Sequence, residues 1–234
     1  MFPIKDTIQS RRLPIVNYLI IGANVAVFLL EASLGPRDLN RLIRAYGLIP
    51  IRLVSDPGAG QITTVFASMF LHGGWLHLIS NMWTLYIFGD NVEDRMGHVR
   101  YLLFYFISGV AAAAAHILTG PGSRVPVVGA SGAISGVLAA YLILFPNSRV
   151  ITLLLVFFLP WFVEIPALFY LGFWFVSQLF NGVFALSVTE TVGTYGGVAY
   201  LAHIGGFLAG LLLVKVFEQR RAFRQWHSDE YWPW

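Results

Sequence analysis

The feature that most constrains this chain is its long apolar stretches, because they leave too little polar surface for a water-soluble fold. Of the 234 residues, 57% are hydrophobic and 12% are charged, whereas a soluble domain carries about 25% charged residues. A helix that crosses a bilayer needs about 20 mostly apolar residues. We therefore predict a membrane protein of one domain, with helical spans at residues 16–34, 75–89, 101–118, 131–145, 167–180 and 198–217.

Three further segments differ from these spans. In residues 36–71, apolar side chains recur at helical spacing with arginines on the opposite face, so we expect an amphipathic helix that lies on the membrane. Its apolar and basic positions are Leu39, Leu42, Ile43, Tyr46, Arg37, Arg41 and Arg44. Prolines and a glutamate interrupt residues 150–164, which predicts a strand-like or re-entrant piece. Residues 183–197 are rich in Gly and Thr and predict a mobile loop that caps a site.

The number of spans sets the topology. Six spans place both termini on one side of the membrane, and if that side is the cytoplasm, ten Lys and Arg lie inside and five outside. This bias predicts cytoplasmic termini. We therefore expect a cytoplasmic segment at residues 1–14, a six-helix domain at 15–218 and a basic cytoplasmic tail at 219–234. The polar start of the chain predicts no cleavable signal, and we expect a prokaryotic plasma membrane.

The charge distribution and the lack of cysteine exclude several classes of function. The net charge of +3 is carried by basic residues scattered between apolar runs, so we expect loops that contact anionic membrane lipids and no nucleic-acid binding. The chain has no cysteine. This excludes disulfides, thiolate chemistry and cysteine-ligated metal sites.

Polar side chains in the predicted spans fall at one depth. Polar groups are costly inside a bilayer and therefore point to function. With cytoplasmic termini, the spans that carry His77, Asn81, Ser131 and His203 all enter from outside. At about 1.5 Å rise per residue, these four side chains lie within about 10 Å of the outer surface. Their convergence from three helices indicates a site.

Small residues recur every four positions on two of these spans. They are Gly132, Gly136 and Ala140 on one span and Ala202, Gly206 and Gly210 on the other. Such faces let two helix backbones approach closely. If the faces meet, the Ser131 hydroxyl lies within hydrogen-bond reach of the His203 imidazole, and histidine is the usual base for a serine nucleophile. No carboxylate is well placed to orient His203, so we expect packing to hold its ring.

At these residues the sequence closely resembles the rhomboid family of intramembrane serine proteases. Three motifs match in the family's order: HGGWLHLISN at residues 72–81 (HxxxxHxxxN), GASG at 129–132 (GxSG) and AHIGGFLAG at 202–210 (AHxxGxxxG). The similarity extends over residues 65–217. Residues 1–60 resemble the family weakly and lack the Trp-Arg pair that many members carry in the first external loop.

The resemblance implies an all-α membrane protein, a six-helix rhomboid-like bundle with an amphipathic first external loop. It implies Ser131 as nucleophile, His203 as general base, and an oxyanion hole formed by His77, Asn81 and the Ser131 N–H. Structural roles are expected for the other motif residues, which are His72, Gly129, Gly132, Gly206 and Gly210. The implied substrates are single-span membrane proteins, cut near the outer end of the span, and neither a metal nor an organic cofactor is implied.

Alternatives to a protease remain at this point. A non-catalytic relative that binds membrane helices, as a chaperone or adaptor, explains the small-residue faces but does not require a serine opposite a histidine. A transporter fits less well, because the polar residues lie at one end of the spans. Zinc bound by His72, His77 and His203 fits poorly, since the spacing of the first two differs from that of metalloprotease helices. We interpret Ser135 as a packing serine, and the sequence does not indicate the oligomeric state.

Overall fold

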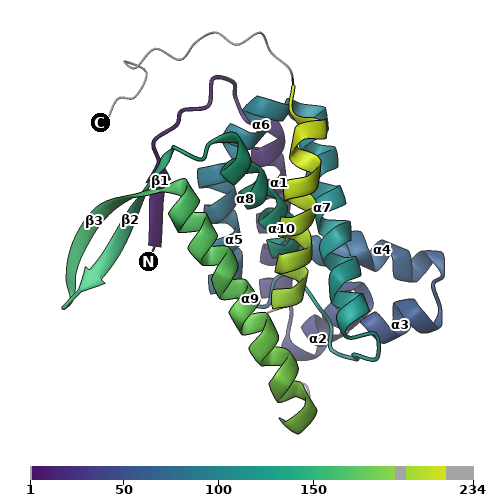
Figure 1. Ribbon diagram of the computed structural model, residues 1–234. Coiled ribbons are helices and arrows are strands. Elements are labelled where there is room, and N and C mark those ends of the chain that lie inside the picture. The colour runs from purple at the N-terminus through teal and green to yellow at the C-terminus, as the bar shows by residue number, and fades with distance from the viewer. Residues whose placement is uncertain (1, 193–198, 220–234) are drawn as a thin grey trace.

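The protein is described by a computed structural model that covers residues 2–192 and 199–219. Its helices are α1 (Ile15–Ser33), α2 (Pro36–Tyr46), α3 (Pro50–Ser55), α4 (Ala59–Ala67), α5 (Trp75–Thr84), α6 (Asp90–Met96), α7 (His98–Thr119), α8 (Ser131–Leu144), α9 (Ala167–Val192) and α10 (Tyr200–Phe217). The 3₁₀ turn η1 (Ser68–Phe70) precedes α5 and the π-helical η2 (Leu85–Gly89) follows it. The strands are β1 (Phe2–Asp6), β2 (Arg149–Val156) and β3 (Leu159–Pro166). Figure 1 shows the long helices gathered in a bundle with the sheet at one side.

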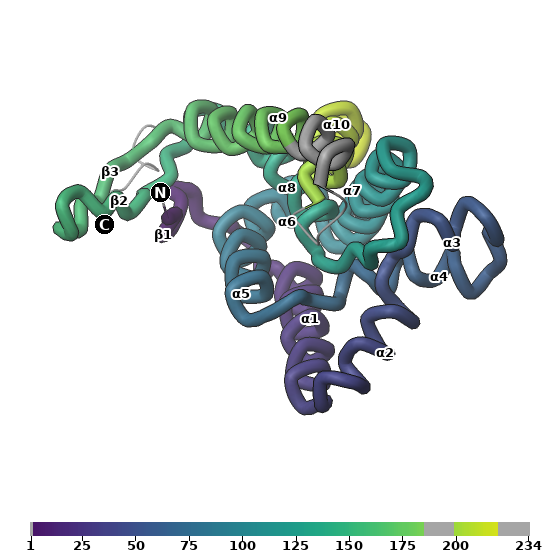
Figure 2. Tube along the Cα trace, turned by 90° about the horizontal axis from the view of Figure 1, so that it is seen from below, coloured from purple at the N-terminus to yellow at the C-terminus, as the bar shows by residue number. Residues whose placement is uncertain are grey.

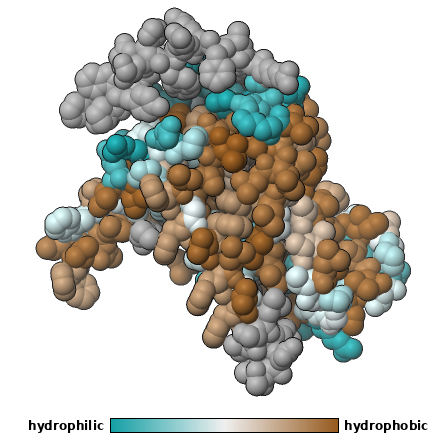
Figure 3. Space-filling model, in the orientation of Figure 1, coloured by the Kyte–Doolittle hydropathy of each residue, from teal (hydrophilic) through white to brown (hydrophobic). Residues whose placement is uncertain are grey.

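The helices have the lengths and compositions of membrane spans. Among the described residues, four helical segments are long and apolar enough to cross a bilayer: α1, α7, α10 and Ala167–Phe184 within α9. A bent pair, Ala59–Phe70 and Trp75–Met96, passes the same test as one broken span with an angle of 81°. Apolar side chains cover the middle of the bundle in Figure 3, and hydrophilic ones gather toward its ends. The molecule is mostly helical and has the character of an integral membrane protein.

The remaining apolar helix, α8, is shorter than a bilayer is thick. Its 14 residues extend about 21 Å, whereas the hydrocarbon core measures about 30 Å. Ten of its residues are buried, and its apolar residues occur on all faces. A helix of this kind belongs inside a bundle rather than against lipid.

Glycines bring α8 and α10 into close contact, as their spacing predicts. A Cβ atom on Gly206 would lie 2.0 Å from the carbonyl oxygen of Gly132, and one on Gly210 would lie 2.4 Å from that of Gly136. Real Cβ atoms do not approach oxygen so closely, so the two backbones meet at distances that only glycine permits. The α8–α10 seam, defined by these four glycines, fixes the relative position of the two helices.

Between the predicted spans at 75–89 and 101–118, the chain stays helical through η2 and α6 to Met96. Glu93 shows why this segment is helical. Its carboxylate is 1% exposed and accepts hydrogen bonds from the backbone N–H groups of Val16 (3.0 Å) and Asn17 (2.7 Å) in the first turn of α1. The first N–H groups of a helix lack intrahelical partners. A helical α6 therefore supplies the acceptor that the start of α1 needs.

The expectation of an all-α protein is incomplete, because the chain also forms a three-stranded antiparallel sheet of order β1-β2-β3. Residues 150–164 lie in the hairpin of β2 and β3, in agreement with the strand-like interpretation. Its turn consists of Phe157 and Phe158, which have positive φ angles of 49° and 67°. The first residues of the chain pair with β2, with Phe2 opposite Leu153. Branched side chains in β2 favour this extended conformation.

The connection between α1 and α5 folds into several short helices. The predicted amphipathic helix is α2, and α3, α4 and η1 complete the segment. Seen along the bundle in Figure 2, α2, α3 and α4 project from one side and the sheet lies on the other. Residues 183–192, which the sequence predicts to belong to a capping loop, are instead helical, because α9 continues to Val192. Residues 193–197 of that cap, residue 198 of the last predicted span and residues 220–234 of the predicted tail lie outside the described residues.

Candidate active site

The first residue of α8 and the fourth of α10 meet across the glycine seam. Ser131 Oγ lies 2.7 Å from His203 Nε2, which is a hydrogen-bond distance. His203 is 8% exposed. Ser131 begins α8, so its own N–H and the next ones have no intrahelical partner and lie at the positive end of the helix dipole. The structure thus joins a hydroxyl, an imidazole and a helix N-terminus at one point.

Gly129 holds the backbone that leads into α8. Its φ angle is +127°, which disfavours other residue types, and a Cβ atom there would lie 2.7 Å from the imidazole of His77. Its N–H donates to the Ser68 carbonyl oxygen at 2.8 Å. The same hypothetical Cβ lies 3.6 Å from Ser131 Oγ. Glycine is therefore needed at this position to bring the His77 ring next to Ser131.

His77 presents one ring nitrogen toward this point. The backbone N–H of Gly73 donates to His77 Nδ1 at 3.4 Å. Because Nδ1 accepts, the neutral ring carries its proton on Nε2. That nitrogen and the adjacent Cε1 are the ring atoms nearest to Gly129, both at 2.7 Å from the hypothetical Cβ. His77 therefore offers an N–H donor on the Ser131 side.

Asn81 lies deeper in the bundle and bonds to His72. Its Nδ2 lies 3.0 Å from His72 Nε2, and His72 Nδ1 lies 3.3 Å from the Phe70 carbonyl oxygen. The backbone N–H of His72 donates to the buried carboxylate of Glu31 in α1, at 3.2 and 3.3 Å. His72 thus ties the turn before α5 to α1. One N–H of the Asn81 amide is used by His72, and the amide has a second.

The sequence interpretation missed the partner of His203. Gln178, in α9 and 8% exposed, has its Oε1 atom 2.8 Å from His203 Nδ1. The expectation that packing alone holds the His203 ring is therefore wrong. A signal was present, because a glutamine within the apolar stretch 167–180 is costly in a bilayer unless it is bonded. Aromatic rings of Trp174 and Tyr200 also flank His203, with centroids 6.1 and 6.4 Å away.

The titratable side chains of this region do not gather in a metal-binding arrangement. Within residues 2–192 and 199–219, no group of three His, Asp or Glu side chains is close enough to hold a metal ion. His72 and His77 have ring centroids 5.1 Å apart, but each uses a ring nitrogen in the backbone contacts described above. One ring nitrogen of each of these two histidines is thus engaged in a hydrogen bond with the backbone.

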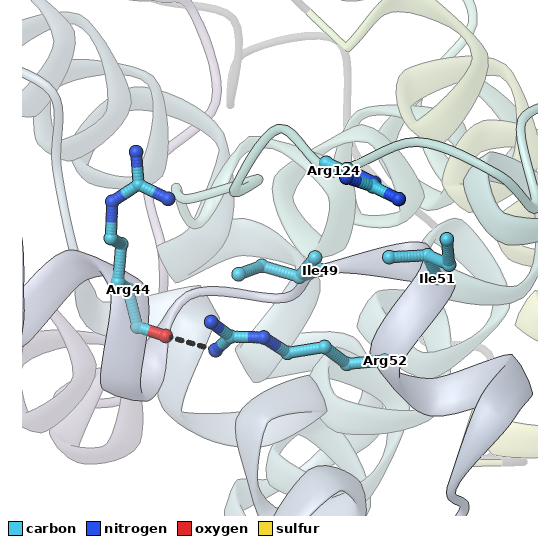
Figure 4. A pocket seen from close by; sticks show the side chains of 5 residues that line it. All are labelled: Arg44, Ile49, Ile51, Arg52 and Arg124. Atoms are coloured by element: carbon cyan, nitrogen blue, oxygen red, sulfur yellow. Dashed lines mark hydrogen bonds between the residues drawn. The ribbon is translucent and has the colours of Figure 1, made fainter.

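A separate pocket lies in the connection between α1 and α5. Its volume is about 290 Å³, and it is lined by Arg44, Ile49, Ile51, Arg52 and Arg124 (Figure 4). These residues come from α2, from α3 and its preceding turn, and from the loop before α8. The pocket contains none of the residues that surround Ser131, so it is a second feature of the surface.

Comparison with known proteins assigns the family. A family model described as the Rhomboid domain matches residues 59–220, which is more than half of the 234-residue chain. The chain belongs to the rhomboid family. The matched range contains the Ser131–His203 contact, the α8–α10 seam and the turn that carries His72, so the resemblance of the three motifs reflects membership of that family.

Curated relatives of this rhomboid come from several kinds of organism. RHOMBOID-like protein 5 of Arabidopsis thaliana is 33% identical over 172 residues, which cover 73% of this chain and 48% of the relative. Rhomboid protein 1, mitochondrial, of Saccharomyces cerevisiae is 28% identical over 88% of this chain and 56% of its own length. Rhomboid protease GluP of Bacillus subtilis is 30% identical over 86% of this chain and 35% of its own length.

The relatives differ from this rhomboid in length, and some of their names place them in different compartments. The chain spans about half, or less, of the length of these relatives. Relatives named as mitochondrial and chloroplastic proteins occur beside the bacterial one. The relatives therefore do not support the narrower expectation of a prokaryotic plasma membrane, whereas the apolar helices and the family agree on a membrane protein.

Proposed function

We propose that this rhomboid is an intramembrane serine endopeptidase that cleaves single-span membrane proteins. The observation that carries the proposal is the contact of 2.7 Å between Ser131 Oγ and His203 Nε2. A serine hydroxyl becomes an effective nucleophile when a base accepts its proton, and His203 is in position to do so. The Bacillus relative, which is named a protease, supports the same function.

In the proposed reaction, Ser131 Oγ attacks the carbonyl carbon of the scissile peptide bond while its proton passes to His203 Nε2. The tetrahedral intermediate collapses, the C–N bond breaks, and His203 gives the proton to the leaving amine. A water molecule then attacks the acyl-enzyme and transfers its proton to His203, which returns it to Ser131 as the ester bond breaks. Each cycle consumes one water molecule.

The negative charge that develops on the carbonyl oxygen needs hydrogen-bond donors. The Ser131 N–H lies at the N-terminus of α8, where the helix dipole favours negative charge. His77 contributes Nε2–H, which lies beside Gly129. Asn81 contributes the N–H that is not bonded to His72. These three donors come from two elements and form the proposed oxyanion hole.

The proposed orientation places the start of α8 near the outer membrane surface and both termini in the cytoplasm. The end of α10 and the start of α1 lie together at the opposite end of the bundle, because Gln219 N–H donates to the Arg95 carbonyl oxygen of α6 and Val16 N–H donates to Glu93. The excess of Lys and Arg in the segments at that end supports this orientation. Substrates are then cut near the outer end of the span, where helix-weakening residues expose the peptide bond.

The test is cleavage of a tagged single-span protein by the purified chain in liposomes, together with labelling of Ser131 by a fluorophosphonate. We expect wild type to cleave and to be labelled, and Ser131→Ala and His203→Ala to lose both activities while keeping the wild-type unfolding temperature. Ser135→Ala is the matched control, since the Ser135 hydroxyl lies one turn deeper in α8 and donates to the Ser131 carbonyl oxygen at 2.7 Å. It should retain both activities.

Two results would reject the protease. Substantial cleavage by Ser131→Ala would remove the proposed nucleophile. A wild-type protein that binds membrane helices but neither cleaves them nor reacts with the fluorophosphonate would instead be a non-catalytic helix-binding protein.

A further inference from the structure

A chain of hydrogen bonds runs from α9 to the Ser131 hydroxyl. Ser177 Oγ donates to the Trp174 carbonyl oxygen at 2.6 Å, and Gln178 Nε2 donates to Ser177 Oγ at 3.2 Å. Gln178 Oε1 lies 2.8 Å from His203 Nδ1. His203 Nε2 in turn lies 2.7 Å from Ser131 Oγ. Five residues from three helices are thus connected in series.

The direction of each bond in this series follows from its neighbour. A backbone carbonyl oxygen only accepts, so Ser177 uses its single proton there and is left as an acceptor. Gln178 must therefore turn its NH₂ group toward Ser177 and its oxygen toward His203. An oxygen acceptor at Nδ1 requires the proton on Nδ1, and a neutral imidazole then has Nε2 free to accept the Ser131 proton.

We infer that Gln178 is a positioning residue that fixes the tautomer and the ring orientation of His203. This inference rests on the proposed function. In many serine hydrolases a carboxylate performs this task, whereas here a neutral amide does so inside the bilayer. A neutral acceptor avoids the cost of a buried charge among apolar helices. Both Gln178 and His203 are 8% exposed, and a hydrogen bond in such surroundings is stronger than one in water.

The test compares Gln178→Leu, which removes the acceptor but keeps the size, with Gln178→Glu, which keeps an oxygen at the same reach. We expect Gln178→Leu to lower kcat and the rate of fluorophosphonate labelling by about 10- to 100-fold, by analogy with the loss of a partner that orients a metal-ligating histidine, with KM unchanged. Gln178→Glu should recover most of the loss. Asn181→Leu is the matched control, because Asn181 is exposed and lies one turn further along α9.

A second readout does not depend on activity. In ¹⁵N-histidine-labelled protein, His203 should carry its proton on Nδ1 in wild type and should shift toward the Nε2–H tautomer in Gln178→Leu. Wild-type labelling rates in Gln178→Leu, equal slowing in Gln178→Glu, or an Nε2–H tautomer in wild type would each overturn the inference. A wild type that is inert but has the Nδ1–H tautomer would reject the proposed function and leave this contact established.

A second feature of the protein is the cavity of about 290 Å³ lined by Arg44, Ile49, Ile51, Arg52 and Arg124, which we call the arginine pocket. Figure 4 shows the three arginine side chains around the two isoleucines. Arg52 donates to the Arg44 carbonyl oxygen at 2.6 Å, and Arg44 donates to the Asn40 side chain at 2.8 Å. Within the described part of the chain, none of the three arginines forms a salt bridge. Three like charges therefore surround one pocket.

The walls of the arginine pocket are held together by backbone bonds. Ile51 N–H donates to the Ser123 carbonyl oxygen at 3.0 Å, and Leu48 and Val127 exchange bonds of 3.0 and 2.8 Å. The loop that carries Arg124 is therefore fixed to the turn between α2 and α3. Exposed apolar side chains, including Tyr46 and Val54, lie on the same two helices. A positively charged pocket beside exposed apolar side chains suits a ligand that carries both an anionic group and apolar chains.

We infer that the arginine pocket binds the phosphate group of an anionic phospholipid. Guanidinium groups match phosphate oxygens in geometry and charge, and an anion would relieve the repulsion among the three arginines. The pocket is part of a membrane protein whose adjoining helices expose apolar side chains, so the phosphate comes with acyl chains attached rather than free in water.

The test measures the unfolding temperature of the detergent-solubilised protein during titration with a short-chain phosphatidylglycerol, since a ligand that binds the folded state stabilises it. Phosphatidylglycerol should raise the unfolding temperature of wild type, and inorganic phosphate and the zwitterionic phosphatidylcholine, which has no net charge, should not. The double variant Arg52→Gln/Arg124→Gln should lose the shift. Arg37→Gln/Arg41→Gln, with the same change of charge on exposed α2 positions outside the pocket, should keep it.

Equal shifts in the two double variants would show a diffuse charge effect and overturn the site. An equal shift with inorganic phosphate would overturn the lipid as the source while retaining phosphate as the recognised group. None of these readouts requires peptidase activity, so the result is independent of the proposed function.

Discussion

Glu93 belongs to α6 but acts at the start of α1, 76 positions away along the chain from Asn17. Its buried carboxylate accepts the N–H groups of Val16 and Asn17 and also bonds to His98 Nδ1. A negative charge at a helix N-terminus is stabilising because it complements the helix dipole. Residue 93 lies outside the predicted spans, and nothing in the local sequence indicates that a carboxylate will cap a helix formed by another part of the chain.

The substitution Glu93→Gln should therefore destabilise the folded protein. The amide keeps one acceptor oxygen but turns an NH₂ group toward the N–H donors of α1, and a buried donor left unpaired costs about 1–3 kcal/mol. We expect a loss of this size in the free energy of unfolding measured in detergent. Glu164→Gln is the control, because Glu164 pairs with Arg149 on the surface, and such exposed pairs contribute about 0–1 kcal/mol. Equal effects of the two substitutions would contradict the capping role.

At the scale of elements, local patterns predicted the helices and the α8–α10 seam, whereas long-range partners could not be predicted. Apolar stretches and a four-residue repeat of small side chains are properties of one segment, so they can be read without knowledge of the fold. The β1–β2 pairing joins residues 2–6 to 150–153, and the Gln178–His203 contact joins α9 to α10. Both depend on how the elements pack against one another in the fold. The site residues of α5, α8 and α10 were predicted because family motifs mark them.

The α8–α10 seam can be tested by making the same substitution, glycine to alanine, inside the seam and outside it. Gly206→Ala places a Cβ atom where the Gly132 carbonyl oxygen lies, at 2.0 Å, so α8 and α10 must separate and the Ser131–His203 contact must lengthen. Overpacking of this kind costs about 1–3 kcal/mol. Gly22→Ala, in α1, meets nothing within 4 Å and should be neutral or stabilising by up to about 1 kcal/mol. Unfolding measurements and fluorophosphonate labelling of both variants provide the check, and wild-type labelling of Gly206→Ala would contradict it.

At the scale of the whole molecule, Asp6 connects the sheet to the helix bundle. Asp6 ends β1 and pairs with Val150 of β2. Its carboxyl group accepts hydrogen bonds from Tyr141 in α8 at 2.5 Å and from the side chain of Asn91 in α6 at 2.8 Å. Burial raises the pKa of Asp6 to about 7, although the bond from Tyr141 acts in the opposite direction. The attachment of the sheet therefore responds to pH in the neutral range.

The sign of this response follows from linkage. The folded protein holds the Asp6 proton up to about pH 7, whereas an unfolded aspartate loses it near pH 3.9, so the stabilising contribution is complete below about pH 4 and is lost as the pH rises to about 7. We expect the unfolding temperature of wild type, relative to that of Asp6→Asn, to fall between pH 5 and pH 8. Tyr141→Phe removes a bond that lowers the pKa of Asp6 and should move this fall to higher pH. A difference between wild type and Asp6→Asn that stays constant from pH 5 to pH 8 would show that the Asp6 carboxyl does not hold a proton in the folded protein.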